Sequence, residues 1–306
     1  MRVLVTGGAG FIGSHIVDAL IGQGHDVVVV DDLSSGKRAN VSPEARFYEV
    51  SITDPESLDR IFAEERPELV NHHAAQTSVR HSMTEPSKDA GINIIGSINL
   101  LQSCVKYGAT RLIFASTCAV YSEPRHVPME EAHPTHPQSA YGMAKYAVEG
   151  YIRFYSDVYG LRYKIFRYGN VFGPRQNPSA EAGVVAIFTG QLLAGTQPTI
   201  FGDGTKTRDY VSVKDVVAAN LLAMGDVGDG EVFNIARGVE VSDFEIFDAV
   251  RTATQVGIEP AYADKRPGEV DRVALDCSKV EKRLGWLPAV QLDEGVQRVV
   301  EYSLQT

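Results

Sequence analysis

The chain of 306 residues is long enough to bury a large core, in one large domain or in two smaller ones. Hydrophobic residues make up 44% of it and charged residues 22%, which is ordinary for a globular protein. The formal net charge of −10 argues against nucleic acid or an anionic membrane surface as the main partner.

No apolar run approaches the ~18 to 20 residues of a membrane span. The cysteines, Cys104, Cys118 and Cys277, are odd in number and far apart, which fits neither a disulfide framework nor a zinc site. We therefore expect no bound metal. Because a strand pattern begins at residue 3, we expect no signal peptide and a cytoplasmic location.

A glycine-rich turn follows the first apolar run. The pattern predicts a strand over Val3–Val5, a turn over Gly7–Gly13 and an amphipathic helix over Ser14–Ile21. The glycines of the turn fit both spacings common in dinucleotide sites, G-x-G-x-x-G and G-x-x-G-x-x-G. Glycines allow a pyrophosphate to approach the backbone, and the free N–H groups at the start of the helix bind its charge. This order of strand, turn and helix predicts a dinucleotide site.

Two acidic residues end the second predicted strand. The run at 26–30 is followed by Asp31 and Asp32, roughly 20 positions beyond the glycines. An acidic residue there hydrogen-bonds the adenosine ribose and repels a 2′-phosphate, so the sequence favours NAD over NADP.

Strand and helix patterns alternate through the first half of the chain, which predicts a doubly wound parallel sheet of the Rossmann type. Further strands are expected at 46–50, 69–72, 111–116 and 164–167, and helices at 55–65, 87–107 and 141–159. Beyond residue 168 the sequence is richer in Gly, Pro and isolated charges. We expect a NAD-binding domain over 1–166 and a smaller, loop-rich α/β substrate-binding domain over 167–306, interwoven with the first.

Tyr141 and Lys145 lie four residues apart in the predicted helix, so they share one face. A free tyrosine has a pKa near ~10 and is a poor base at neutral pH. A cation fixed beside it favours the phenolate, so we expect Lys145 to lower the pKa of Tyr141.

Ser116 and Thr117 end the predicted strand at 111–116, where residues of a doubly wound sheet face the ligand crevice. The Thr117 hydroxyl would share a hydrogen bond with a substrate alcohol. Thr117, Tyr141 and Lys145 beside a nicotinamide suit the oxidation of a secondary alcohol.

The sequence resembles the extended short-chain dehydrogenase/reductase family, and within it the UDP-glucose 4-epimerase group. The motifs that bear this resemblance follow the family order over nearly the whole chain. They are Thr6-Gly7-x-x-Gly10-x-x-Gly13, Asp31-Asp32-Leu33, His73-Ala74-Ala75-Gln76, Asn93, Ser116-Thr117 with Val120-Tyr121, Tyr141-x-x-x-Lys145, Arg167-Tyr168-Gly169-Asn170-Val171, Thr207-Arg208-Asp209-Tyr210-Val211 and Arg266-Pro267-Gly268-Glu269.

The resemblance implies a set of residues that bind NAD. The catalytic residues Tyr141 and Lys145 belong to this set as well. The other members are Gly7, Gly10, Phe11, Ile12, Gly13, Asp31, Asp32, Leu33, Ser34, Ser35, Gly36, Ser51, Ile52, His73, Ala74, Ala75, Gln76, Asn93, Ser116, Tyr168 and Val171.

The resemblance also implies a UDP-hexose site, in which arginines meet phosphate oxygens in pairs. Besides Thr117 and Tyr141, the implied residues are Ser78, Asn170, Thr199, Phe201, Arg208, Arg266, Glu269 and Val273. Asn170, Arg208 and Arg266 would hold the diphosphate, Thr199, Phe201 and Glu269 the uridine, and Val273 would gate the sugar 2-substituent.

The sequence departs from the family pattern at Ser51, where an aspartate usually contacts adenine, and at Ser122, where a glycine usually follows Val-Tyr. Members that dehydrate or decarboxylate the sugar have a carboxylate just after the catalytic threonine. Here those positions hold Cys118 and Ala119, which favours simple 4-epimerisation through a transient 4-keto sugar.

Three alternatives stay open. The chain could epimerise another nucleotide sugar, such as UDP-glucuronate, a UDP-N-acetylhexosamine or a dTDP- or GDP-hexose. It could be a net NAD-dependent dehydrogenase or reductase, or a non-catalytic NAD-sensing scaffold. The resemblance also implies a homodimer that pairs helices near 90–106 and 141–158.

Overall fold

The computed structural model describes residues 1–178, 183–266 and 270–305, which form two compact units. Unit 1 consists of Met1–Ser122, Pro134–Arg167 and Val217–Phe233, and unit 2 of Glu123–His133, Tyr168–Val216 and Asn234–Thr306. None of the described helices is both long and apolar enough to cross a membrane.

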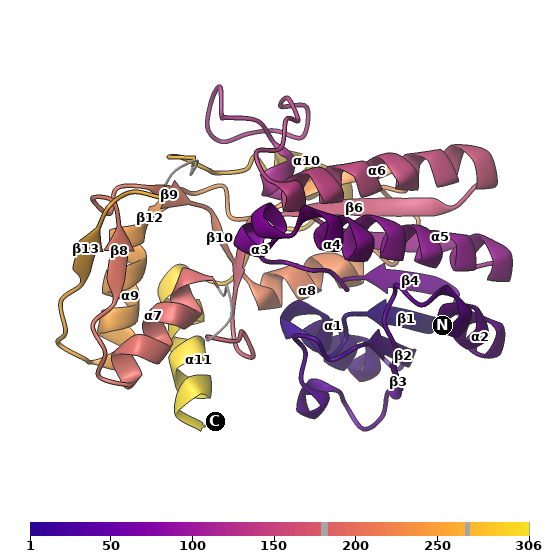
Figure 1. The fold of residues 1–306 in the computed structure, drawn as a ribbon, viewed down its shortest axis with the longest axis horizontal. Helices are drawn as coiled ribbons and strands as arrows, with labels where there is room; N and C mark the ends of the chain where they lie inside the picture. The colour runs from indigo at the N-terminus through magenta and orange to yellow at the C-terminus, as the bar shows by residue number, and fades with distance from the viewer. Residues whose placement is uncertain (179–182, 267–269, 306) are drawn as a thin grey trace. The chain divides into compact units, whose positions relative to one another are not determined.

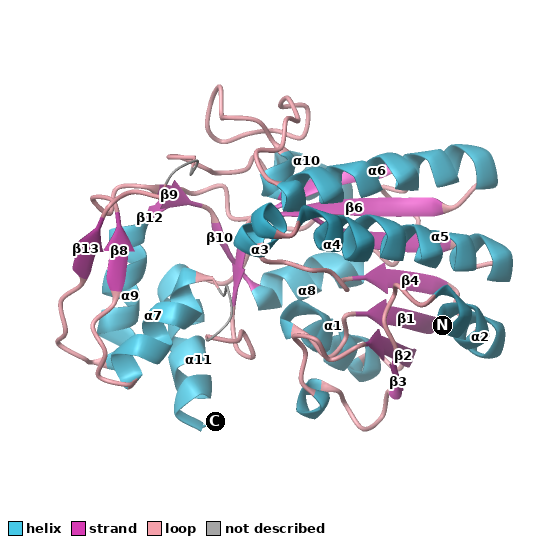
Figure 2. Ribbon diagram, viewed as in Figure 1, coloured by secondary structure: helices cyan, strands magenta, loops and turns pink. Residues whose placement is uncertain are grey.

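The described part of the chain contains one seven-stranded sheet in the order β11-β6-β5-β4-β1-β2-β3 (Figures 1 and 2). Its strands are β1 (Arg2–Thr6), β2 (Asp26–Asp31), β3 (Arg46–Glu49), β4 (Leu69–His72), β5 (Arg111–Thr117), β6 (Arg162–Tyr168) and β11 (Glu231–Ile235). The predicted Rossmann-type α/β class is confirmed.

The order in which strands are added to the sheet reverses at β1, which pairs in parallel with β2 on one side and with β4 on the other. Thr6 lies opposite His72 in this register, so the segments that follow the two strands begin side by side. In open α/β sheets this switch point is where ligands bind. It receives both the glycine turn and the segment beginning at His73.

Three helices of unit 1 pack over one face of the sheet. They are α2 (Pro55–Glu65), α5 (Gly96–Tyr107) and α6 (Ala140–Tyr159). Side chains such as Leu58, Leu100 and Ile152 form one hydrophobic core with Leu4 and Val70 of the strands. The remaining helices assigned wholly or partly to unit 1 are α1 (Phe11–Gly22), α3 (Val79–Thr84), α4 (Pro86–Ala90) and α8 (Val213–Leu222).

The helix expected over 87–107 is interrupted by a π-helical turn. α4 ends at Ala90, Gly91–Ile95 forms the π turn, and α5 follows from Gly96. π-Helical turns inside helices are rare and are frequent at functional sites. This one contains Asn93, which the resemblance places near the cofactor.

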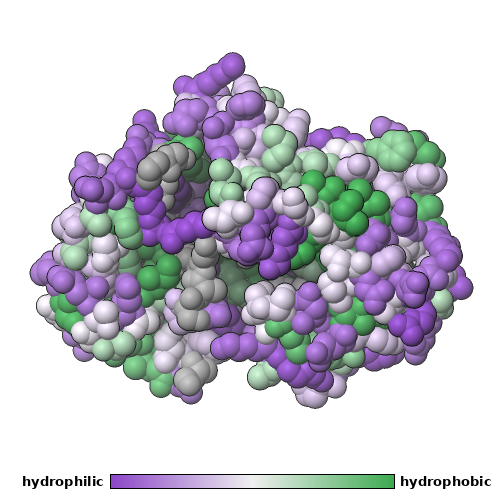
Figure 3. Space-filling view, viewed as in Figure 1, coloured by the Kyte–Doolittle hydropathy of each residue, from purple (hydrophilic) through white to green (hydrophobic). Residues whose placement is uncertain are grey.

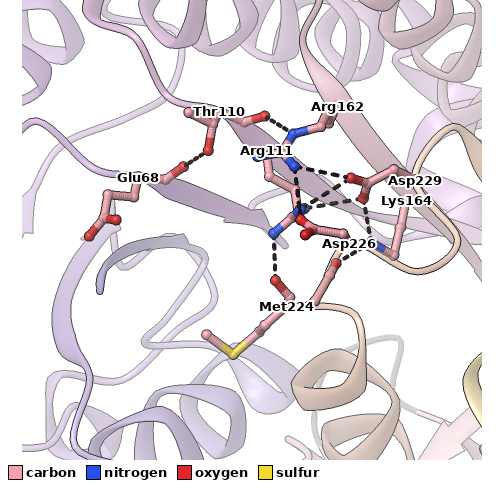
Figure 4. A network of polar contacts seen from close by, with 9 residues as sticks. Glu68, Thr110, Arg111, Arg162, Lys164, Met224, Asp226 and Asp229 are labelled. Carbon is pink, nitrogen blue, oxygen red and sulfur yellow. Dashed lines mark hydrogen bonds and ion pairs between the residues drawn. The ribbon is translucent and has the colours of Figure 1, made fainter.

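A polar network holds the segment after α8 against the sheet of unit 1 (Figure 4). The Arg111 side chain, only 6% exposed, forms ion pairs with Asp226 and Asp229, and the buried Lys164 also pairs with Asp229. Arg162 adds a more exposed pair with Asp226 at 2.8 Å. Because buried charges need partners, these contacts fix the segment that leads into β11.

Unit 2 has small two-stranded sheets and its own core. Its elements are β7 (Asn170–Phe172), α7 (Val184–Leu193), β8 (Thr199–Phe201), β9 (Thr207–Arg208), β10 (Tyr210–Ser212), β12 (Val241–Ser242), α9 (Asp243–Thr254), β13 (Ala261–Ala263), α10 (Ser278–Leu284) and α11 (Leu292–Gln305). Phe172, Phe188, Phe247 and Val296 pack together between its helices and strands.

Candidate active site

The glycine turn after β1 has no room for side chains. A Cβ atom on Gly13 would lie 2.1 Å from the Gly7 carbonyl oxygen, and one on Gly7, whose φ is +71°, would lie 2.6 Å from the Ala74 nitrogen. The N-cap residue of α1, Gly10, makes no side-chain capping bond. Close backbone and an uncapped helix start are the features that hold a pyrophosphate, so this turn fits the dinucleotide.

Asp31 organises the same turn from the end of β2. Its Oδ2 accepts a hydrogen bond from the Ala9 nitrogen and its Oδ1 one from Leu33, both at 2.9 Å. Burial raises the pKa of this carboxyl group. Asp32 accepts from the backbone and hydroxyl of Ser34 at 3.0 and 2.5 Å. The acidic pair thus lies beside the glycine turn, as an adenosine-ribose site requires.

Gly36 belongs to the same cluster. A Cβ there would lie 2.9 Å from Ala9, and Lys37 donates to the Ala9 carbonyl at 3.0 Å. Ser51, the departure at the expected adenine position, lies 3.0 Å from the Thr53 hydroxyl. Ile52 is buried in the core of the unit, so its predicted contact with adenine would have to come from its backbone.

The ends of β1 and β4 are joined by a chain of buried polar groups that the sequence did not reveal. His72 lies between the Thr6 hydroxyl, at 2.7 Å from Nδ1, and the Ser97 hydroxyl, at 2.9 Å from Nε2. Ser97 donates to the Asn93 carbonyl at 2.5 Å, and the Ala74 nitrogen donates to Thr6 at 3.2 Å. Burial holds the pKa of His72 well below its ordinary value, so this imidazole stays neutral and fixes the loop beyond β4.

Tyr141 and Lys145 lie in the first turns of α6, whose N-cap Ser139 accepts from the Gly142 nitrogen. A Cβ on Gly142 would lie 2.4 Å from the Ala119 carbonyl oxygen, so this glycine lets α6 approach the segment after β5. That approach places Thr117 where its side chain lowers the pKa of Tyr141. The three predicted catalytic residues therefore lie together in unit 1.

The electrostatics differ from the expectation. Burial raises the pKa of Tyr141, and the hydrogen bond from Thr117 only partly opposes it. Lys145, 3% exposed, donates instead to the Ala115 carbonyl at 2.9 Å, and its Nζ lies 4.8 Å from the centre of the Phe114 ring. Burial lowers the pKa of Lys145 to about 8. In the chain alone, desolvation is the largest effect on the pKa of the Tyr141 phenol.

A buried ion pair behind the catalytic residues was also missed. Glu149, one turn beyond Lys145, accepts from Ser116 at 2.7 Å and from Arg167 at 2.9 and 2.7 Å. The three residues link the ends of β5 and β6 to α6. Ser116, predicted as a cofactor contact, is 3% exposed and faces this network. Glu149 lies four residues beyond Lys145 on the same helix, and this spacing is the feature of the sequence that could have indicated it.

Other predicted residues of unit 1 lie in the segment after β4. Gln76 bonds to Asn93 through both backbone groups, at 2.9 and 3.0 Å, and to the backbone of Ser78. Ser78 caps α3 by accepting from His81 at 2.8 Å. His73, Ala74 and Ala75 complete this segment, and burial lowers the pKa of His73 to about 3.

Unit 2 brings together several residues predicted for the nucleotide sugar. β8 pairs with β13, and the Arg266 guanidinium lies 3.5 Å from the centre of the Phe201 ring. Thr199 opens β8, and Arg208 lies in β9 and donates to the Thr207 carbonyl at 2.7 Å. Asn170, in β7, donates through its backbone to the Asp209 carbonyl at 2.7 Å.

Asp209 is the buried anchor of this part of unit 2. Its carboxylate accepts from the backbone of Arg237, Gly238 and Leu275 at 2.8 to 3.0 Å, and so ties the chain between β9 and β10 to two other segments. Burial raises its pKa to about 6. Tyr168 and Val273 are buried as well, and Val171 lies in β7. Glu269 lies outside the described residues.

The described residues contain no group of three or more His, Cys, Asp or Glu side chains arranged to hold a metal ion. Unit 1 therefore holds a dinucleotide cradle and a hydroxyl–phenol–amine set. This arrangement can oxidise and reduce an alcohol carbon next to a bound nicotinamide.

Known proteins resemble the chain over its full length. A UDP-glucose 4-epimerase of Mycolicibacterium smegmatis is 42% identical over 308 residues, which cover 99% of this chain and 98% of that protein. The crystal structure of the Thermotoga maritima UDP-glucose 4-epimerase with UDP-glucose is 51% identical, with a TM-score of 0.98 over 100% of this chain and 99% of that one.

The UDP-glucose 4-epimerase of Thermus thermophilus, in complex with NAD, is 43% identical, with a TM-score of 0.93 over 99% of this chain and 98% of that one. The NAD dependent epimerase/dehydratase family matches residues 3–236. The glycine cradle, the Thr117–Tyr141–Lys145 set and this match agree: the chain belongs to the NAD dependent epimerase/dehydratase family.

Proposed function

We propose that the protein is an NAD-dependent epimerase that interconverts UDP-glucose and UDP-galactose at C4. The observation that supports this most directly is that Thr117, Tyr141 and the buried Lys145 lie on the same unit as the glycine cradle, with Tyr141 and Lys145 one helical turn apart. The full-length similarity to a structure that contains UDP-glucose supports UDP-glucose as the substrate.

Tyr141 takes the proton of the sugar 4-hydroxyl, and Thr117 holds the same oxygen by a hydrogen bond. A bound NAD would supply the acceptor and then the donor of the C4 hydride, and its positive ring would favour the phenolate. The 4-keto sugar must turn over between the two transfers so that its other face is reduced. Tyr141 then gives the proton back to the new hydroxyl. Lys145 orients the ribose and supplies positive charge near the phenol.

Residues that would hold NAD are the glycine cradle, Asp31, Asp32, the segment 73–76, Asn93 and Lys145. Asn170, Arg208, Arg266 and Phe201 would hold the UDP group, and these assignments are part of the proposal. The absence of a carboxylate at Cys118 and Ala119 supports epimerisation over dehydration, because the carboxylate that would move a proton at C5 or C6 is missing from these two positions.

Turnover with added NADH separates this function from a net reductase. An epimerase converts UDP-galactose without changing the NADH concentration. A reductase consumes NADH in proportion to its product, and this result would overturn the proposal. A parallel assay with UDP-GalNAc tests whether the small Val273 admits an acetamido group.

We also propose that the protein is a homodimer of the cytoplasm. A groove of about 890 Å³ lies between α2, α5 and α6. On α6, Tyr151, Phe154, Val158 and Tyr159 are 40 to 55% exposed. Figure 3 shows apolar side chains where α5 and α6 lie in Figure 1. Such a face favours helix-to-helix association. Analytical ultracentrifugation should give twice the mass of one chain. The mass of one chain for wild type would contradict a dimer.

A further inference from the structure

Asp89 is a buried carboxylate in the active-site region that none of the steps above uses. It lies on α4, immediately before the π-helical turn, and its side chain is fully buried. Aspartate is almost never fully buried unless it is paired. Its burial therefore calls for a role.

The carboxylate holds two amide side chains. Asp89 Oδ1 accepts from Gln76 Nε2 at 2.7 Å and from Asn93 Nδ2 at 3.0 Å. These same amides fix the loop after β4, since Gln76 also donates to the Ser78 carbonyl and Asn93 exchanges hydrogen bonds with the Gln76 backbone. The π turn sets Asn93 so that it can reach both partners. Gln76 and Asn93 are residues that the proposed function places beside NAD.

Asp89 Oδ2, by contrast, has no hydrogen-bond partner within the described residues. One oxygen thus supplies the structural contacts while the other adds charge. An asparagine could keep its oxygen toward Gln76 and Asn93 and place its amide nitrogen where no donor opposes it. The charge and the geometry of Asp89 can therefore be changed separately.

The charge of Asp89 acts on the catalytic groups. It raises the pKa of Lys145 against the lowering effect of burial, and it also raises the pKa of Tyr141. Other titratable groups around these residues are His72 at the end of β4, His73 just after it, His81 on α3 and Cys118 after β5. Glu149, one turn beyond Lys145 on α6, is paired with Arg167. Because burial keeps the pKa of both His72 and His73 low, they are neutral near pH 7. Asp89 therefore acts on Lys145 as a negative charge.

We propose that Asp89 is a positioning residue with two separable roles: its Oδ1 orients Gln76 and Asn93 toward the dinucleotide, and its unpartnered Oδ2 leaves a buried negative charge in the active-site region. The inference rests on the proposed function for the identity of the dinucleotide site. It does not depend on which sugar is turned over.

Three variants test these roles on the full chain. Asp89→Asn removes the charge and keeps the acceptor, whereas Asp89→Ala removes both. Glu85 has an exposed carboxylate just before α4 that pairs with Lys88 at 3.5 Å. Glu85→Gln is therefore the matched control. The first readout is the titration of Lys145 by NMR of protein labelled at the lysine Cε, with the signal assigned from its loss in Lys145→Met. The second readout is the dissociation constant of NAD.

Asp89→Asn should shift the Lys145 titration to lower pH, with NAD binding within about threefold of wild type. Asp89→Ala should shift the titration and also weaken NAD binding roughly tenfold or more, because two buried amides lose their acceptor. Glu85→Gln should change neither. An unshifted titration in Asp89→Asn would overturn the charge role, and wild-type NAD affinity in a folded Asp89→Ala would overturn the orienting role.

The proposed function fails separately. If wild type binds NAD but leaves UDP-galactose unchanged, the substrate is wrong, and the Asp89 titration result still stands. The alkaline limb of the activity profile adds a third readout: it should move to lower pH in Asp89→Asn, together with the Lys145 titration. A merely structural role would lower activity without moving this limb.

Discussion

The reacting groups show how a local environment can oppose the chemistry it serves. Tyr141 must lose a proton, yet burial raises its pKa, and Lys145 has its own pKa lowered to about 8. The hydrogen bond from Thr117 favours the phenolate, and so does the positive charge of an oxidised nicotinamide. The enzyme would therefore be poised to react only with its cofactor in place.

Tyr141→Phe removes the proton-accepting oxygen and leaves the ring in place. We expect kcat to fall by about 10²- to 10⁴-fold, the usual contribution of a general base. NAD content should match that of wild type, because the cradle is untouched. Near-normal turnover in this variant would show that another group accepts the proton.

Lys145 also makes stability depend on pH. Its pKa is about 8 in the folded chain and 10.5 in the reference state, so between these values the unfolded chain binds more protons. Relative to Lys145→Met, wild type should gain stability as pH rises through this window, by at most about 1.4 kcal/mol per pH unit. Urea unfolding at several pH values, without added dinucleotide, measures this difference. A fall in the stability of wild type relative to Lys145→Met as pH rises would have the wrong sign and would contradict this account of Lys145.

At the scale of elements, the site depends on close approach between segments. The glycine turn touches the segment after β4, and Gly142 lets α6 touch the segment after β5. Behind them, the Ser116–Glu149–Arg167 network fixes two strands to one helix. Each contact makes a distinct prediction.

Gly13→Ala places a methyl group against the Gly7 carbonyl oxygen, at 2.1 Å before relaxation. The turn must open, so we expect the purified variant to contain little NAD and to unfold at a lower temperature. Gly22→Ala, at the end of the same helix, has no atom within 4 Å of the new carbon and is the control. Equal NAD content in the two variants would argue against the cradle.

Glu149→Gln leaves Arg167, whose side chain is 4% exposed, without a counter-charge. Breaking a buried pair in this way costs about 3 to 5 kcal/mol. Arg153, the outer partner of Glu149, has a side chain that is 39% exposed. Arg153→Gln should therefore lower the free energy of unfolding by about 1 kcal/mol or less. Chemical denaturation of both variants measures the contrast, and equal losses would mean that the inner pair is not special.

At the scale of the whole molecule, the sequence predicted the strands and helices of the first half closely. The helix expected over 55–65 is α2, and the strand expected over 69–72 is β4. These patterns are readable because a buried parallel sheet needs continuous apolar strands and its helices need an apolar stripe. The glycine turn and the catalytic residues were found for a similar reason, since their spacing is set by local chemistry.

Long-range partners were not predictable in this way. Asp89 and Glu149 look like surface carboxylates in a helix, and only the packing of separate segments shows that both are buried. The π turn at 91–95 leaves no mark in the hydrophobic period. The short strands of unit 2, such as β9 and β13, form through pairing with distant segments rather than through their own propensity.

The most direct test of the account is NMR of the purified protein with UDP-galactose and no added NAD. We predict conversion to UDP-glucose until the two sugars reach equilibrium, because a cofactor that regains its starting state in each cycle need not be supplied. Failure to convert UDP-galactose, even after NAD is added, would contradict the proposed 4-epimerase.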